Sequence, residues 1–90
     1  MNSIEVTRDI ERVIKEIAAQ NGMNLPELKD SMAIVDDLGF TSLTVAALIA
    51  NLEEVFGVDP FMDENVMITD IRTVNDLSSV YTTCLNQQNG

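Results

Sequence analysis

The stretch Asp36-Asp37-Leu38-Gly39-Phe40-Thr41-Ser42-Leu43-Thr44-Val45 decides the fold of this chain. A glycine ends an irregular segment, two hydroxyl residues follow it, and a long apolar segment then begins. Ser and Thr cap helices because their side-chain oxygens accept hydrogen bonds from the free backbone N–H groups of the first turn. Position alone therefore predicts that Thr41 or Ser42 caps a helix. The same position also suits a phosphate-linked group on Ser42, since free N–H groups and the helix dipole favour negative charge there.

The residues that follow predict a second helix over 42–56. Its apolar side chains occupy two faces, with Ala46, Ile49, Leu52 and Phe56 on one and Val45, Leu48 and Val55 on the other. A helix that is apolar nearly all round is either buried or used for docking. We expect a partly exposed apolar patch near Ser42. The alternative is that the long connection before the helix covers this surface.

Three further segments complete an all-α prediction. Residues 3–20 predict the first helix, because their apolar side chains recur at steps of three and four, namely Val6, Ile10, Val13, Ile14, Ile17 and Ala18. Residues 22–41 form a long loop that should pack back on the helices, since Met32, Ile34, Val35 and Leu38 are too apolar for a solvated linker. Residues 61–65 predict a short third helix, and Thr73 with Asp76 resembles a capping box that opens a fourth helix through about Leu85.

The predicted fold is thus a four-helix bundle of three main helices and one short third helix. At 90 residues the chain suits a single domain over residues 1–90, with an ordered core over about 4–85. The single cysteine, Cys84, excludes an intramolecular disulfide and is expected in the core.

The charge of the chain limits its partners. It has 15 acidic and 5 basic residues and no histidine, for a net charge of −10. This argues against binding to nucleic acid or an anionic membrane, and it favours partners with basic surfaces. The longest apolar run, residues 43–52, is too short to span a membrane. With no secretory signal before the first helix and no apolar run of transmembrane length, we expect a cytoplasmic protein. Because like charges repel, we expect a monomer.

The chain has few of the side chains that catalytic sites require. Without histidine, neither a Ser-His-Asp nor a Cys-His arrangement can form. Zinc would find only carboxylates and one thiol, and the four glycines are too scattered for a phosphate-binding loop. We therefore expect no enzyme and no metal site. If Ser42 has a function, another protein acts on it.

The central stretch resembles the phosphopantetheine-attachment region of acyl carrier proteins. The resemblance lies in Leu38-Gly39-Phe40-Thr41-Ser42-Leu43-Thr44, followed by Leu52-Glu53-Glu54-Val55-Phe56-Gly57-Val58. The family pattern is Leu-Gly-x-Asp-Ser-Leu, then a helix that ends in an acidic pair and a phenylalanine. The likeness extends over roughly residues 4–85, because the helix lengths, the long first connection and the opening of the last helix also fit.

The resemblance implies a carrier of acyl intermediates, held as thioesters on a 4′-phosphopantetheine arm attached to Ser42, for fatty-acid or polyketide-like biosynthesis. A separate phosphopantetheinyl transferase would attach the arm from coenzyme A. Ligases or synthases with basic docking surfaces would be the other partners, and the apolar interior between helices could shelter the acyl chain. The implied partner-binding residues are Thr41, Leu43, Thr44, Val45, Ala47, Leu48, Glu53, Glu54 and Met62.

Two positions depart from the family pattern. Thr41 stands where the family usually has aspartate, and Ala47 stands at a position that is usually acidic. Together with the Gly-Phe-x-Ser-Leu-Thr motif, these departures favour a specialised free-standing carrier, closer to those of polyketide pathways than to that of housekeeping fatty-acid synthesis. One alternative is a peptidyl or aminoacyl carrier, which an adenylating ligase would serve. Another is an unmodified helical interaction module in which Ser42 is only a cap.

Overall fold

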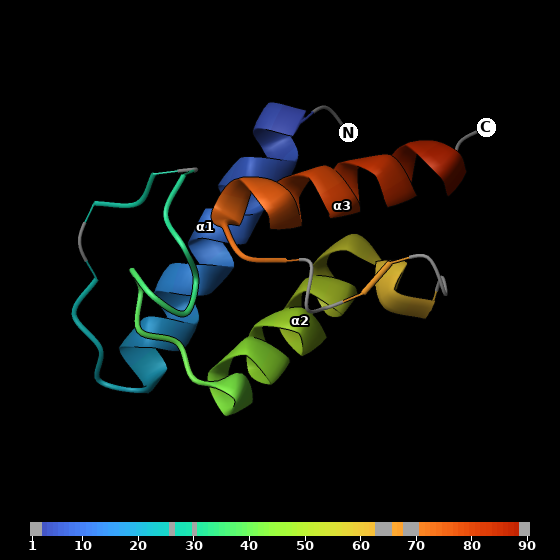
Figure 1. Ribbon diagram of the computed structural model, residues 1–90. Helices are drawn as coiled ribbons and strands as arrows, with labels where there is room; N and C mark the ends of the chain where they lie inside the picture. Colours follow the sequence, from blue (N-terminus) through green and yellow to red (C-terminus); the bar gives the residue numbers. More distant parts are fainter. Residues whose placement is uncertain (1–2, 26, 30, 63–65, 68–70, 89–90) are drawn as a thin grey trace.

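The computed structural model of the chain describes residues 3–25, 27–29, 31–62, 66–67 and 71–88. These residues form three α-helices, α1 (Ser3–Gln20), α2 (Ser42–Phe56) and α3 (Val74–Gln88), and a short 3₁₀ turn, η1 (Pro60–Met62). As Figure 1 shows, α3 crosses α1, and α2 packs on α1 below that crossing. The all-α prediction is confirmed. None of the helices in the described part of the chain is long and apolar enough to cross a membrane.

The helix α1 supplies one side of the core. All six residues of its predicted apolar stripe are buried, with exposed fractions of 2% or less: Val6, Ile10, Val13, Ile14, Ile17 and Ala18. Their spacing puts them on one face, and burying a large aliphatic side chain contributes about 1.5–3 kcal/mol. The periodicity of α1 therefore predicted its packing correctly.

The helix α2 is more apolar than α1 but buries less of itself. Leu48 and Leu52 are its buried residues, whereas Leu43 is 81% exposed and Val55 is 42% exposed. The apolar patch predicted near Ser42 is thus open at Leu43. The helix ends at Gly57, which adopts a left-handed conformation (φ 69°) and donates its N–H to the Glu53 carbonyl at 2.8 Å.

The connection between α1 and α2 forms the wide cyan-to-green loop in Figure 1. It packs back on the helices as predicted, since Ile34, Leu38 and Phe40 are buried, although Val35 is 58% exposed. A short antiparallel bridge pairs Ala33 with Thr73. The Ile34 N–H donates to the Arg72 carbonyl at 2.8 Å, and the Val74 N–H donates to the Met32 carbonyl at 3.1 Å. This bridge ties the loop that leads into α2 to the start of α3.

The two later helices differ from the sequence prediction at their ends. The predicted short helix over 61–65 is a 3₁₀ turn that begins at Pro60, where the fixed φ of proline suits a first position; residues 63–65 lie outside the described residues. The predicted capping box at Thr73 and Asp76 is confirmed, but α3 continues beyond Leu85 to Gln88. Its apolar stripe is buried at Val74, Leu77 and Tyr81, and Cys84 packs half-buried against the core, as predicted.

Candidate functional site

Thr41 and Ser42, the two consecutive hydroxyl residues at the start of α2, have different roles. Thr41 is the cap: it has extended backbone angles (φ −84°, ψ 170°), and its Oγ1 accepts a hydrogen bond from the Thr44 N–H at 3.2 Å. The Thr41 and Thr44 hydroxyls also pair at 2.9 Å. Ser42 is therefore the first helical residue and not the cap. Its side chain is exposed, and no residue in the described part of the chain is hydrogen-bonded to it.

The surroundings of Ser42 suit an anionic group. The first turn of α2 contains no acidic residue, so no carboxylate competes for the positive end of the helix dipole. The exposed hydroxyl stands beside Leu43, whose side chain is 81% exposed and leaves the approach open. These features fit a phosphodiester at the Ser42 Oγ, since helix N-termini bind phosphate through free N–H groups.

An apolar groove begins at Ser42. It has a volume of about 340 Å³ and lies between the loop, α2 and α3. Apart from Ser42, its lining is entirely apolar: Ile34, Val35, Val45, Leu48, Ile49, Ile71 and Leu77. A hydroxyl at the edge of such a groove can carry a flexible group whose far end is hydrocarbon.

The predicted partner-binding residues separate into two groups along α2. Thr41, Leu43, Thr44, Val45 and Ala47 lie within the first two turns, beside Ser42, and all are exposed or half-buried. Glu53 and Glu54 lie near the other end of the helix, about 15 Å further along its axis at 1.5 Å per residue.

Met62, 81% exposed, lies close to Glu53, because both line one open cavity. The predicted role of Leu48 has to be corrected. Its side chain has no exposed surface, so the prediction that it contacts a partner directly is wrong; it belongs to the core and to the wall of the groove.

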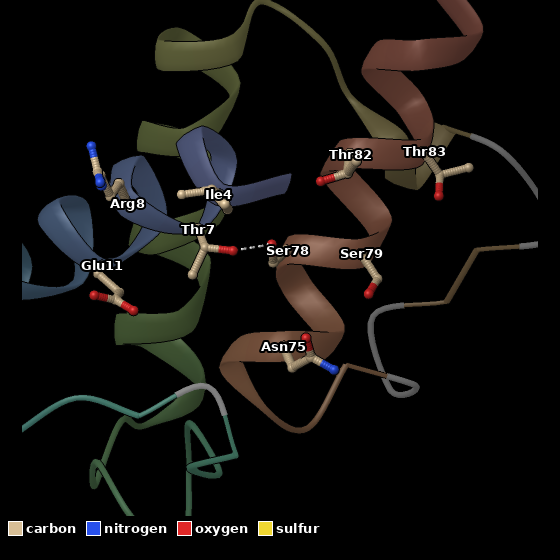
Figure 2. A pocket seen from close by; sticks show the side chains of 9 residues that line it. All are labelled: Ile4, Thr7, Arg8, Glu11, Asn75, Ser78, Ser79, Thr82 and Thr83. Atoms are coloured by element: carbon tan, nitrogen blue, oxygen red, sulfur yellow. Dashed lines mark hydrogen bonds between the residues drawn. The ribbon is translucent and has the colours of Figure 1, made fainter. Parts of the chain in front are cut away.

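A second hollow lies away from Ser42, between α1 and α3. It has a volume of about 590 Å³, and Figure 2 shows that its side chains are largely polar. The Thr7 and Ser78 hydroxyls point toward one another and are hydrogen-bonded at 2.6 Å, which allows Ser78 to be buried. This hollow has neither a nucleophile at a helix start nor an apolar lining, so it is not suited to an acyl chain.

The sequence did not predict most of the residues that line the groove, nor all of those near the acidic end of α2. The spacing of Ile71 and Leu77 predicts only core packing and a helical stripe, and it gives no sign of a groove shared by three segments. The placement of Asp59 in one cavity with Glu53 is also a product of folding. The one available signal was the composition of α2, which is too apolar for a surface helix of a small domain.

Comparisons with known proteins agree with this geometry. Residues 11–80 match the family described as a phosphopantetheine attachment site. The chain is also similar to MacpD, an acyl carrier protein from Pseudomonas fluorescens involved in mupirocin biosynthesis, whose solution structure is known. The two share 38% sequence identity with a TM-score of 0.79, over 89% of this chain and 70% of that one.

Proposed function

This chain belongs to the phosphopantetheine attachment family, and we propose that Ser42 is the residue to which its 4′-phosphopantetheine is joined. Members of the family are carriers and not catalysts, and their prosthetic group is covalently bound. The observation that supports Ser42 is the division of roles at the start of α2. Thr41 supplies the cap, and the Ser42 hydroxyl is left exposed at the edge of an apolar groove.

The residues around Ser42 each have a part in this function. In the attachment, the Ser42 Oγ loses its proton and attacks the pyrophosphate of coenzyme A, whose P–O–P bond breaks and releases adenosine 3′,5′-bisphosphate. The free N–H groups of the first turn of α2 stabilise the negative charge of the phosphodiester that forms. Thr41 holds the helix start in place with or without the group. When bound, phosphopantetheine supplies a thiol that holds an acyl group as a thioester.

The groove beside Ser42 supports acyl groups as the cargo. Its seven other lining residues are aliphatic, so a hydrocarbon chain that entered it would leave water without meeting an unpaired polar group. An aminoacyl cargo would bring an ammonium group, and a peptidyl cargo would bring amide groups, for which this lining has no partner. The interpretation in which Ser42 only caps α2 loses its basis, because Thr41 has that role.

We further propose that the partners are a phosphopantetheinyl transferase and the enzymes of a specialised pathway of the polyketide type. The likeness to MacpD, an acyl carrier protein of mupirocin biosynthesis, supports a specialised pathway. The outer surface of α2 supports it as well, since residues 41–52 carry no charge. Along α2, the docking surface next to Ser42 is thus uncharged, and its acidic residues are Glu53 and Glu54.

Intact mass after incubation with coenzyme A, magnesium and a broad-specificity phosphopantetheinyl transferase tests the attachment. We expect a gain of one phosphopantetheine in the parent protein and none in Ser42→Ala. Thr41→Ala is the matched control, because it removes the neighbouring hydroxyl and should still be modified. Modification of Ser42→Ala would refute the assignment. So would an unmodified parent protein with native helical circular dichroism, if a known carrier is modified in the same mixture.

A further inference from the structure

We infer that the short bridge between Ala33 and Thr73 is a clasp, which has to open before an acyl chain can reach the inner end of the groove beside Ser42. This inference rests on the proposed function, because it concerns how the cargo of the carrier enters the groove. It gives a role to a loop contact that neither the attachment of phosphopantetheine nor the docking of partners requires.

The groove has an accessible rim and a closed inner end. Its inner residues come from three different segments and are buried, with exposed fractions of 3% for Ile34 and 0% for Leu48 and Leu77. A surface that water cannot reach is also closed to a methylene group, which is larger. An acyl chain therefore contacts these side chains only if one wall of the groove moves. The rim residues are exposed or half-buried: Val35, Ser42, Val45, Ile49 and Ile71.

The loop is the wall of the groove that is held least firmly. The other two walls are α2 and α3, and each of them packs along α1. Among the described residues, two backbone hydrogen bonds join the loop to the start of α3. The Ile34 N–H donates to the Arg72 carbonyl, and the Val74 N–H donates to the Met32 carbonyl. Such a pair contributes little net stability, because the same groups bond to water when it opens.

The bridge lies directly beside the residues that line the groove. On one strand, Ile34 and Val35 follow Ala33 in the chain. On the other strand, Ile71 lies two residues before Thr73. Parting the two strands therefore widens the groove without any movement of α2. A chain that lies between the inner residues keeps the strands apart.

The turn that follows the bridge has hydrogen bonds of its own. The Asp37 and Leu38 N–H groups donate to the Ala33 carbonyl at 2.9 and 3.1 Å. The Ala33 N–H donates to a carboxylate oxygen of Asp37 at 2.7 Å. Leu38 and Phe40 are buried in the core and anchor the end of the turn that leads into α2. The bridge can therefore open while the turn and its anchor stay in place.

A disulfide in place of the bridge tests whether it has to open. The N–H groups that donate belong to the residues after Ala33 and Thr73, so these two residues form a non-hydrogen-bonded pair. The Cα atoms of such a pair lie about 4.5 Å apart, within the range of about 4.4–6.8 Å that a disulfide spans. The variant is Ala33→Cys/Thr73→Cys/Cys84→Ala, in which the third substitution removes the only natural thiol.

The variant is oxidised first and then loaded at Ser42 from a coenzyme A analogue that holds an octanoyl group in amide linkage, which leaves no thiol on the arm. Intact mass confirms the attachment. We expect no nuclear Overhauser contacts between the octanoyl methyl group and the methyl groups of Leu48 and Leu77. The contacts should appear when the same sample is reduced with a phosphine. Loss of the Thr73 cap affects both states equally.

Three results of this experiment would overturn the inference. One is contact with Leu48 and Leu77 in the oxidised protein, and another is no contact after reduction. The matched control is Ala33→Cys/Cys84→Ala, which has a single thiol and cannot close. Loss of the contacts in this control under the same oxidation would show that closure of the bridge is not what excludes the chain.

Amide hydrogen exchange in the parent protein is a second test, which needs no variant. The N–H groups of Ile34 and Val74 report on the bridge, because each donates across it. We expect both to exchange several-fold faster with an octanoyl group attached than with an acetyl group. The Gly57 N–H, which donates to the Glu53 carbonyl at the other end of α2, should be unchanged. Equal exchange of Ile34 and Val74 in the two forms would contradict the clasp.

Failure of these tests is distinguishable from failure of the attachment proposal. The mass of the loaded protein reports on Ser42, whereas the methyl contacts and the exchange rates report on the groove and the bridge. An octanoyl group that is attached but never contacts Leu48 or Leu77 would leave the carrier function intact and refute the clasp.

Discussion

The starts of α2 and α3 share the same threonine cap but differ in the charge of the first turn and in the exposure of the first helical residue. Each is capped by a threonine whose Oγ1 accepts the N–H of the third helical residue, Thr44 at 3.2 Å and Asp76 at 3.1 Å. In α3 that third residue is an acid. Its Oδ2 accepts the N–H groups of Thr73 and Arg72, both at 3.1 Å. In α2 the corresponding residue is Thr44, and the first turn has no acid at all.

The first helical residues of α2 and α3 also differ, in how far their side chains are exposed. In α3 it is Val74, which has no exposed surface, and in α2 it is Ser42, which is exposed. The start of α3 therefore neutralises its own dipole and belongs to the core. The start of α2 is capped but leaves both its positive potential and its first side chain available to a ligand. Since both helices are capped by the preceding threonine, the difference lies in the residues that follow the cap: α2 has no acid in its first turn and exposes its first side chain.

The largest expected difference concerns the first helical residue of each helix. Val74→Ala should lower the free energy of unfolding by about 1.5–3 kcal/mol, because a fully buried aliphatic side chain is lost. Ser42→Ala should change it by less than about 0.5 kcal/mol, because the side chain is exposed and unpaired. Urea unfolding of the unmodified proteins measures both. A loss in Ser42→Ala as large as in Val74→Ala would mean that Ser42 has a structural role.

Replacing the two capping threonines should show a smaller difference in unfolding free energy. Thr73→Ala should cost about 1–2 kcal/mol and Thr41→Ala about 0.5–1 kcal/mol, because Thr73 takes part in a reciprocal box and Thr41 caps an exposed turn. Thr41→Asp should restore the stability lost in Thr41→Ala, since aspartate also caps well. Thermal unfolding followed by circular dichroism compares the three variants. If Ser42→Ala were more destabilising than Thr41→Ala, the cap would have been assigned to the wrong residue.

The smallest effect is a dependence on pH that only α3 should show. Backbone hydrogen bonds from Thr73 and Arg72 lower the pKa of Asp76 below its usual value in the folded protein. Its contribution to stability is therefore complete above the unfolded pKa, near 4, and is lost as the pH falls through the lower folded pKa. The difference in unfolding free energy between the parent protein and Asp76→Asn should be constant from pH 7 to about 5 and shrink below about 4. A difference that stayed the same down to pH 3 would contradict this account.

The parts of the fold that could be predicted are those in which one segment decides its own structure. The stripe of α1 has the helical period, so its buried face follows from the sequence alone. The box at Thr73 and Asp76 spans four residues, and its bonds form as predicted. The family followed in the same way, because the motif around Ser42 and the acidic end of the following helix lie within one short stretch.

The parts that were missed depend on several segments at once. Leu48 and Leu43 are the same residue type in the same apolar helix, yet one is fully buried and the other is 81% exposed. Nothing in the composition of α2 separates them, because an apolar helix has no polar face to mark its orientation. The choice is made by α1 and by the loop that the Ala33–Thr73 bridge holds in place.

The sequence by itself determined the helices, the acidic charge, the family and the serine that we propose to be modified. These follow from spacing, capping chemistry and a short motif, which act over a few residues of chain. The tertiary structure decided which hydroxyl caps α2, where the apolar groove opens, and that the Tyr81 hydroxyl is buried with no hydrogen-bond partner among the described residues. Burial and unpaired polar groups are properties of packed surfaces, and those surfaces exist only once distant segments have met.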